Sequence, residues 1–381
     1  MMYYINDYDL INDFHCKSGH SNGSIKSYQT VFNKYTEFHN MSLCELLGEA
    51  ISEQEKRIPE NKLSIYDRII TFRNHLSKNH MVNTITNAIS KIKTFYLYNR
   101  VYLPFIPPLN RKQVKKNDVI AFEDLPTKDE LRHALRFSGD NLALWILVMI
   151  SSGSTRAEAK SMTNEMFFKG TLEYHKKDNF KDAMKYLSRK KNVVCTCKML
   201  RKKTDKPYYT FLNPECVQKI AKVKLKQNDL DMENPLLKYD VNYVNYRFRI
   251  LNDYLGLGEV GGFSRLRPHM LRKFNATHLN QGSIERELLD MDCVDLLHGR
   301  GKNSTRQSYF KDNPEYLKLE YIKAMSNISL DYRYEYKISN GKVKVLAIPL
   351  WMVGLDMRLF QKLCWFSKSF LRLSFQMRSL R

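Results

Sequence analysis

The chain has 381 residues, of which 43% are hydrophobic, so it is long enough for two or three domains with buried cores, and wholesale disorder is excluded. Lysine and arginine number 62 against 40 aspartates and glutamates, which gives a formal net charge of +22. This surplus predicts a polyanionic partner, nucleic acid before others, although an acidic membrane surface or an acidic protein would also satisfy the charge.

The cysteine spacing, the first residues and the length of the longest late apolar stretch predict a cytoplasmic protein. The seven cysteines are scattered, and no CxxC pair has a matching second pair, so we expect reduced thiols and no structural zinc. The first residues, MMYYINDYDLINDF, lack the pattern of a secretory signal, and the apolar stretch 345–355 is too short to span a bilayer. No membrane partner is therefore expected.

Apolar residues recur at helical spacing through the first hundred positions. In 24–38 the stripe is Ile25, Tyr28, Phe32 and Tyr35, and segments 65–76 and 83–98 show the same period. We predict an N-terminal extension over 1–20 and a small helical bundle over 21–105. Its basic, hydroxyl-rich faces suit phosphate contacts, although a solvated bundle face has a similar composition.

Prolines then interrupt the helical pattern. The segment LPFIPPLNRKQVKKND, residues 103–118, forbids a continuous helix and ends in a run of basic residues, which predicts a basic interdomain linker over 106–125. After it, Thr127 and Glu130 have the spacing of a capping box, as do Thr155 and Glu158. Between these two boxes, 141–150 is continuously apolar and is expected to form a buried helix.

The second domain is expected to be mixed in structure over 126–330. Two strands are predicted around the polar turn RKKTD within 171–211, with Cys195 and Cys197 on one face, and helices prevail from about 236 to 325. The tail, 331–381, begins with what reads as two short strands or a terminal extension. Its last part, 355–381, is basic and rich in Leu, Phe and Trp. Packing on a neighbouring protomer, a membrane-surface helix and a tail altered by gene rearrangement all stay open.

The segment RPHMLRKF, residues 267–274, places two cationic side chains at the start of a predicted helix. Pro268 suits the first helical position, where its missing N–H costs nothing. His269 and Arg272 are three residues apart and so are neighbours on a helix surface. Together with the helix N-terminus they form a candidate cradle for an anion, the alternative being a solvated basic face.

This pair belongs to a set of catalytic residue types in a recognisable order along the chain. The set consists of Arg156, Lys203, His269, Arg272, His298 and Tyr309. Over roughly 20–325 the order resembles the tyrosine recombinase (phage integrase) family, most strongly over 264–325 in RPHMLRKFNATHLNQG and STRQSYF. The segment YFKDNPEYLKLEYIKAM resembles the archaeal branch in particular.

The resemblance implies a mainly α fold with a small β-sheet. A helical DNA-binding bundle of the SAM-like type would precede a mixed α/β tyrosine recombinase catalytic domain. It also implies a DNA recombinase of the integrase or invertase type that needs neither metal nor ATP nor another cofactor. Double-stranded DNA and other protomers of the same chain, in a tetramer on paired sites, would be the partners.

The chemistry of DNA cleavage explains why these residue types are needed. A tyrosine phenol, here Tyr309, can attack a phosphodiester once its proton is removed. The attack forms a 3′-phosphotyrosyl link and leaves a free 5′-hydroxyl on the other strand end. Arginines suit the charge that grows on the nonbridging oxygens, a role that the resemblance gives to Arg156 and Arg272. By the same resemblance Lys203 is the general acid, and His269 and His298 assist.

Two departures from the family pattern and a choice among several lysines keep alternatives open. Thr155 stands where the family's first arginine would align, so Arg156 lies one residue late, and Leu297-His298-Gly299 inverts the usual Leu-Gly-His order. Neighbouring lysines at 198, 202 and 206 compete with Lys203 for the hairpin role. A type IB topoisomerase-like relaxation of supercoils and a non-catalytic DNA-binding repressor or architectural protein are the competing functions. The sequence does not distinguish integration of a mobile element from excision, inversion or dimer resolution.

Overall fold

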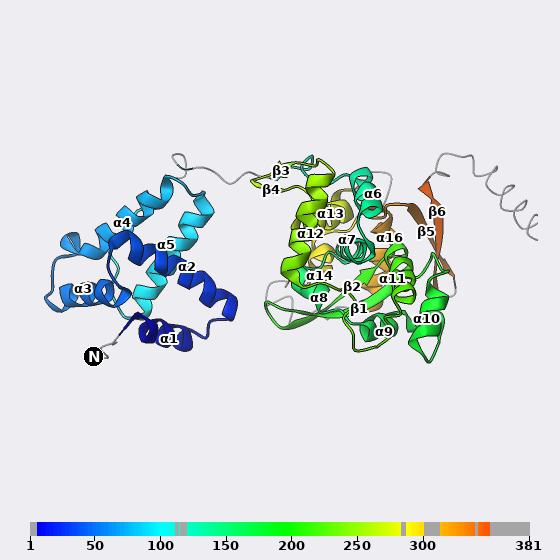
Figure 1. Ribbon diagram of the computed structural model, residues 1–381, viewed down its shortest axis with the longest axis horizontal. Coiled ribbons are helices and arrows are strands. Elements are labelled where there is room, and N and C mark those ends of the chain that lie inside the picture. The colour runs from blue at the N-terminus through cyan, green and yellow to red at the C-terminus, as the bar shows by residue number, and fades with distance from the viewer. Residues whose placement is uncertain are drawn as a thin grey trace, which may run out of the picture. The chain divides into compact units, whose positions relative to one another are not determined.

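The computed structural model describes residues 6–110, 114, 120–282, 287–300, 313–339 and 342–350, and Figure 1 shows its ribbon. The chain divides into two compact units, Met1–Val119 and Ile120–Arg381. Within the described residues the chain is mainly helical, and its strands pair in three separate two-stranded antiparallel sheets. The predicted fold class, mainly α with a small β component, is therefore confirmed.

The first unit is a bundle of helices around one apolar core. Its helices are α1 (Asp7–Ser18), α2 (Asn22–His39), α3 (Leu43–Glu55), α4 (Ser64–Ser77) and α5 (Val82–Tyr98), with a 3₁₀ turn at Glu60–Lys62. In α2, Phe32 and Tyr35 of the predicted stripe are buried, and the Tyr35 hydroxyl lies 3.3 Å from that of Tyr96 on α5. The three helices that the sequence predicts here are confirmed.

Helix α1 lies within the stretch for which the sequence predicts an extension, yet it packs into the bundle. Leu10 and Phe14 are buried in the same core as the other helices. The Asp7 carboxylate accepts hydrogen bonds from the backbone N–H groups of Leu43 and Cys44, both at 2.9 Å. Since those N–H groups have no partner within α3, this contact caps one helix with the first residue of another.

The second unit contains the remaining helices and all of the described strands. Its helices are α6 (Lys128–Phe137), α7 (Asp140–Ser152), α8 (Arg156–Lys160), α9 (Asn164–His175), α10 (Phe180–Leu187), α11 (Pro214–Gln227), α12 (Val241–Tyr254), α13 (Pro268–Gln281), α14 (Met291–Leu297) and α16 (Pro314–Ala324), with a 3₁₀ turn at Met325–Asn327. The strands are β1 (Cys195–Arg201), β2 (Lys206–Leu212), β3 (Glu259–Val260), β4 (Phe263–Ser264), β5 (Tyr332–Ser339) and β6 (Lys342–Pro349).

Helix α7 forms the centre of the second unit. Every residue from Leu142 to Ser152 is buried, which confirms the prediction of a buried helix, and α7 packs against α13, α11 and β2 (Figure 1). The helix ends at Gly153, whose φ of 62° is left-handed. Both predicted capping boxes, at Thr127 and at Thr155, are present at the starts of the helices on either side of α7.

The β1–β2 hairpin is in the register that places both of its cysteines in the core. Arg201 pairs with Lys206 next to the turn, and Asp205 in the turn has a left-handed φ of 49°. Cys195 and Cys197 are both buried on one face, as predicted. The hairpin tip, with the turn residues that follow Arg201, is exposed.

The two strands predicted in the tail form the β5–β6 hairpin. Its start is held by Glu215, whose carboxylate accepts hydrogen bonds from the backbone N–H groups of Leu330, Asp331 and Tyr332, each at 2.9 Å. The apolar segment 355–381 lies outside the described residues. Among the helices that the structure describes, none has the length and apolarity to cross a membrane.

Candidate functional site

The site is built where α7 turns into α8. Thr155 caps α8, and the Glu158 carboxylate accepts a hydrogen bond from the Thr155 N–H at 2.8 Å. Gly153 allows the turn, since a Cβ there would lie 2.1 Å from Nε2 of His298 and 2.5 Å from Oδ1 of Asn275. The backbone of this turn is therefore in direct contact with side chains from α13 and from the end of α14.

Arg272 on α13 is the charged group closest to the turn. Its Nη1 donates to the Gly153 carbonyl at 2.5 Å and its Nη2 to the His298 carbonyl at 3.2 Å, while Oε2 of Glu158 lies 3.7 Å from Nη1. The side chain is only 8% exposed, and burial lowers the pKa of the guanidinium while Glu158 raises it. Because arginine stays protonated in proteins, the structure holds a buried, positively charged fork in one orientation.

His298 lies wholly buried beside it, at the end of α14. Its Nε2 is 2.7 Å from Oδ1 of Asn275, whose amide nitrogen donates to the carbonyls of Ile150 and Ser151. Since the amide nitrogen is the donor to both carbonyls, Oδ1 is the acceptor, and Nε2 of His298 carries the proton. Burial, followed by the charges of Arg272 and two further arginines, lowers the pKa of His298, so the ring is neutral near pH 7.

A cavity of about 390 Å³ opens in front of Arg272. Its lining includes the basic residues His269, Arg272, Lys273 and Arg300. It also includes the apolar residues Ile120, Ala121, Phe122 and Leu125. Burial and the nearby cations Lys273, Arg267, Arg272 and Arg300 lower the pKa of His269. The structure thus brings His269 and Arg272, the two residues of the predicted cradle, to one cavity with a surplus of positive charge.

Two of the predicted site residues lie apart from this cavity, and one lies outside the described residues. Arg156 is the first residue of α8 and is half-buried, and among the described residues its guanidinium has no hydrogen-bond or ion-pair partner. Lys203 is exposed in the turn of the β1–β2 hairpin. Tyr309 lies in the segment 301–312, outside the described residues.

Four residues of the site are absent from the sequence prediction. Asn275 orients His298, Arg300 lines the cavity, Arg201 donates to the Gly299 carbonyl at 2.5 Å, and Tyr208 packs its ring against Gly299. Burial raises the pKa of Tyr208, whose buried hydroxyl has no hydrogen-bond partner among the described residues. Only Asn275 carries a sequence signal, because it lies three residues after Arg272 on the helix that carries His269.

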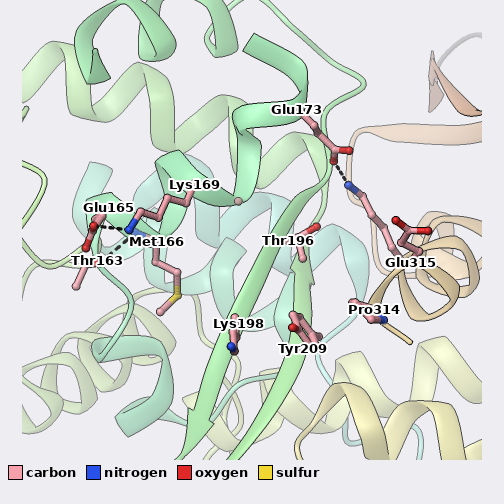
Figure 2. A pocket seen from close by; sticks show the side chains of 12 residues that line it. Thr163, Glu165, Met166, Lys169, Glu173, Thr196, Lys198, Tyr209, Pro314 and Glu315 are labelled. Atoms are coloured by element: carbon pink, nitrogen blue, oxygen red, sulfur yellow. Dashed lines mark hydrogen bonds and ion pairs between the residues drawn. The ribbon is translucent and has the colours of Figure 1, made fainter. Parts of the chain in front are cut away.

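A larger hollow of about 610 Å³ lies along α9, β1 and the start of α16, and Figure 2 shows its lining. Its lysines are matched in number by glutamates, and two ion pairs form among them, since Lys169 lies 2.7 Å from Glu165 and Lys318 contacts Glu173. None of the predicted site residues lines it. The smaller cavity at Arg272 is the better candidate for an anion, because there the cations outnumber the carboxylates.

Helix α12 presents a basic and aromatic surface. Arg247 lies over the rings of Tyr239 and Tyr243, and Arg249 lies over the ring of Tyr246. The rings of Tyr243 and Tyr246 are at least 40% exposed. Arg247 also donates to the Tyr243 hydroxyl at 3.3 Å. Stacked guanidinium groups at a surface have further N–H groups that can bind phosphates or bases. We call these five residues the α12 surface.

Comparisons with known proteins give structural similarities only. No protein-family model matches the chain, and no curated protein matches it. The crystal structure of XerA recombinase is 16% identical, with 83% of this chain and 98% of that chain covered and a TM-score of 0.34.

Two structures of lambda integrase are also similar. For a tetramer bound to a Holliday junction the identity is 12%, the coverage 81% of this chain and 80% of that chain, and the TM-score 0.46. For a dimer bound to a COC′ core site the identity is 13%, the coverage 80% and 77%, and the TM-score 0.41. XerA recombinase and lambda integrase are thus among the proteins whose solved structures are similar to this chain.

Proposed function

We propose that the chain is a site-specific DNA recombinase that cuts and rejoins duplex DNA through a 3′-phosphotyrosyl intermediate on Tyr309. The observation that carries the proposal is the buried guanidinium of Arg272, which lies between the carbonyls of Gly153 and His298 and lines a cavity shared with His269. A charge fixed in a site of low polarity stabilises an anion most when its orientation is set beforehand. A phosphodiester in the transition state is such an anion.

The proposed reaction needs no external energy source. The phenol of Tyr309 gives up its proton to water as its oxygen attacks phosphorus, and the bond from phosphorus to the 5′-oxygen breaks. The 5′-oxygen takes up a proton, which we assign to Lys203, because this lysine stands on an exposed hairpin turn that can approach bound DNA. The 5′-hydroxyl of a partner strand then attacks the phosphotyrosyl ester and releases Tyr309, so the number of phosphodiester bonds is unchanged.

The remaining residues of the set are assigned by their surroundings and by the family resemblance. His269 borders the cavity and can donate a hydrogen bond to a nonbridging oxygen, whereas His298 is buried and neutral and holds the Gly153 turn through Asn275. Arg156 is assigned to the phosphate by resemblance. It has no protein partner among the described residues, so its guanidinium is available to a ligand.

The partner in this proposal is duplex DNA, held by the second unit in part through the α12 surface. The net charge of +22 and the stacked arginines on α12 support a polyanion that also offers planar groups. Other copies of the chain, in a tetramer on paired sites, are the second partner that we propose, because strand exchange needs two DNA sites brought together.

Covalent trapping tests the proposal. The full chain is incubated with nicked duplexes made from DNA that flanks its own gene, and the mixture is run on a denaturing gel. We expect a DNA-linked protein band that Tyr309→Phe abolishes and that Tyr316→Phe, a change at an exposed tyrosine of α16, leaves in place. A band that survives Tyr309→Phe contradicts the choice of nucleophile.

A non-catalytic DNA-binding role is the second candidate, and the displacement of Arg156 favours it. If the protein binds the duplexes and no covalent band forms on any of them, this second function replaces the first. If a band forms and supercoiled circles are relaxed without exchange between sites, the activity is that of a type IB topoisomerase.

A further inference from the structure

We infer that Arg300 is a further phosphate-contacting arginine of this site and that Arg201 positions it. The inference rests on the proposed function, since it assigns a residue to the same phosphate. Arg300 is an addition to the two arginines, Arg156 and Arg272, that the family resemblance supplies. It follows directly after His298-Gly299, where this chain inverts the family's order of glycine and histidine.

The placement of Arg300 is the first observation. Arg300 lines the cavity together with His269, Arg272 and Lys273, whereas Arg156 is not among the residues that line it. A phosphate held by Arg272 in this cavity would therefore meet Arg300 as its next arginine. Two guanidinium groups around one phosphate can donate to both nonbridging oxygens, where charge accumulates as the nucleophile attacks.

The chain route explains how Arg300 arrives there. Helix α14 ends at His298, and Gly299 turns the chain with a left-handed φ of 64°. The Arg300 N–H then donates to the Asp295 carbonyl at 2.8 Å, which closes the turn. The order His298-Gly299-Arg300 therefore inverts the family's glycine and histidine and at the same time brings an arginine to the site two residues after the buried histidine.

The turn is held from the β1–β2 hairpin. Nη1 of Arg201 donates to the Gly299 carbonyl at 2.5 Å, and a Cβ on residue 299 would lie 2.7 Å from the Tyr208 ring. The carbonyl of His298 accepts from Arg272. The carbonyls of the two residues before Arg300 thus accept hydrogen bonds from the buried Arg272 and the half-buried Arg201. The backbone position of Arg300 is therefore fixed even though its own side chain is exposed.

The side chain of Arg300 is free to change partner. Its ion pair joins Nη1 to Oδ1 of Asp295 at 3.0 Å, and the two side chains are 48% and 42% exposed. Exposed ion pairs of this kind are weak, so a phosphate in the cavity can replace the carboxylate at small cost. The charge already acts on the site, because Arg300 contributes, after burial, to lowering the pKa of His269, Arg272 and His298.

The experiment compares Arg300→Ala with Arg333→Ala in the full chain. Arg333 is a partly exposed arginine of β5 with a nearby carboxylate, Glu335, so its replacement removes the same charge outside the cavity. Single-turnover cleavage of a nicked duplex is measured by covalent trapping. Removal of a preorganised donor of this kind slows the chemical step by on the order of 100-fold. We expect that loss for Arg300→Ala and less than a threefold change for Arg333→Ala.

A second substrate separates contact with phosphate from a structural role. A methylphosphonate at the scissile position is neutral and has one charged oxygen fewer to stabilise. If Arg300 contacts the phosphate, the ratio of wild-type to Arg300→Ala rates falls at least tenfold on this substrate, and guanidinium added to the variant partly restores cleavage of the ordinary duplex. An equal loss on both substrates, or a rate equal to that of Arg333→Ala, overturns the inference.

The outcomes also separate the inference from the proposed function. If the wild-type chain forms no covalent band, the proposed function fails, and binding of tungstate, a phosphate-like oxyanion, to wild type and Arg300→Ala is measured by calorimetry instead. At least tenfold weaker binding by the variant supports Arg300 as an anion ligand. Equal binding, or no binding by either protein, overturns it. Arg201→Lys, which keeps one donor for the Gly299 carbonyl, is expected to retain more of the cleavage rate than Arg201→Ala.

Discussion

Nε2 of His298 lies 2.7 Å from Oδ1 of Asn275, in a site where both side chains are buried and the Asn275 amide also holds the end of α7. One amide thus sets the tautomer of the histidine and joins α13 to the turn that precedes α8. The Gly153 carbonyl of that turn accepts a hydrogen bond from Arg272, and the link can be tested without any assumption about activity.

Asn275→Ala removes this link. The change leaves the Nε2–H of His298 and the carbonyls of Ile150 and Ser151 without their partner, so we expect the free energy of unfolding to fall by about 2–4 kcal/mol. Urea unfolding followed by circular dichroism measures it. Asn280→Ala on the same helix is the control, because it loses one hydrogen bond, to the Leu289 carbonyl, and is expected to cost about 1 kcal/mol. Equal losses in the two variants would contradict the special role of Asn275.

Gly153→Ala tests the close approach at the turn. A methyl group there would be strained at φ 62° and would also lie 2.1 Å from Nε2 of His298. Gly256→Ala provides the matched control, since its φ is 64° and nothing lies within 4 Å of the added Cβ. We expect about 1 kcal/mol of destabilisation at 256, from the backbone alone, and at least about twice that at 153. Thermal unfolding of both variants checks the difference, and equal melting temperatures would show that His298 can move aside.

Stability is expected to fall in acid because of two histidines that are neutral in the folded chain, the half-buried His278 and the buried His298. Burial lowers the pKa of His278 to about 4, and burial with nearby arginines lowers that of His298. The unfolded chain binds a proton at these sites near pH 6.5, and the folded chain does so only at lower pH. Their contribution is therefore complete above pH 6.5 and is lost as the pH falls from 6.5 toward 4.

Melting temperatures between pH 7.5 and 4.5 measure this loss. His278→Gln, which removes one of the titrating groups, should make the curve shallower, and His133→Gln on the exposed side of α6 serves as the control. A curve for His278→Gln that is as steep as that of the wild type would show that His278 is not one of the groups responsible.

The α12 surface is expected to contribute to DNA affinity through phosphate contacts. Replacement of Arg247 and Arg249 by glutamine should reduce the slope of log K against log salt by about 1.8, since each phosphate contact accounts for about 0.9. Lys219 and Lys226 on α11 are the control pair, because both are ion-paired with Asp140 and their replacement by glutamine also removes two positive charges. Fluorescence anisotropy at several salt concentrations gives both slopes. The same slope change in both double variants would show that the loss of any two positive charges weakens DNA binding equally, and that the α12 surface has no particular role.

Local sequence patterns predicted many of the helices and strands, because the start and the buried face of such an element depend on residues close together in sequence. The stripe from Ile25 to Tyr35, the capping boxes at Thr127 and Thr155 and the strands around RKKTD each encode their structure within about fifteen residues. Helix α1 carries a weaker signal, since its burial depends on contacts such as Asp7 with the start of α3, which are distant in sequence.

The sequence by itself determined the helical class, the basic character, the two cationic residues of the cradle and the order of the candidate catalytic residues. Only the tertiary structure decided that Arg272 and Arg300 share a cavity and that Arg201 contacts the turn before Arg300. These three arginines come from separate elements, whose spacing depends on how α7, α13, α14 and the β1–β2 hairpin pack. The tertiary structure also decided that His298 is buried and neutral. A charge or proton state depends on burial and on neighbours in space, which a linear pattern does not contain.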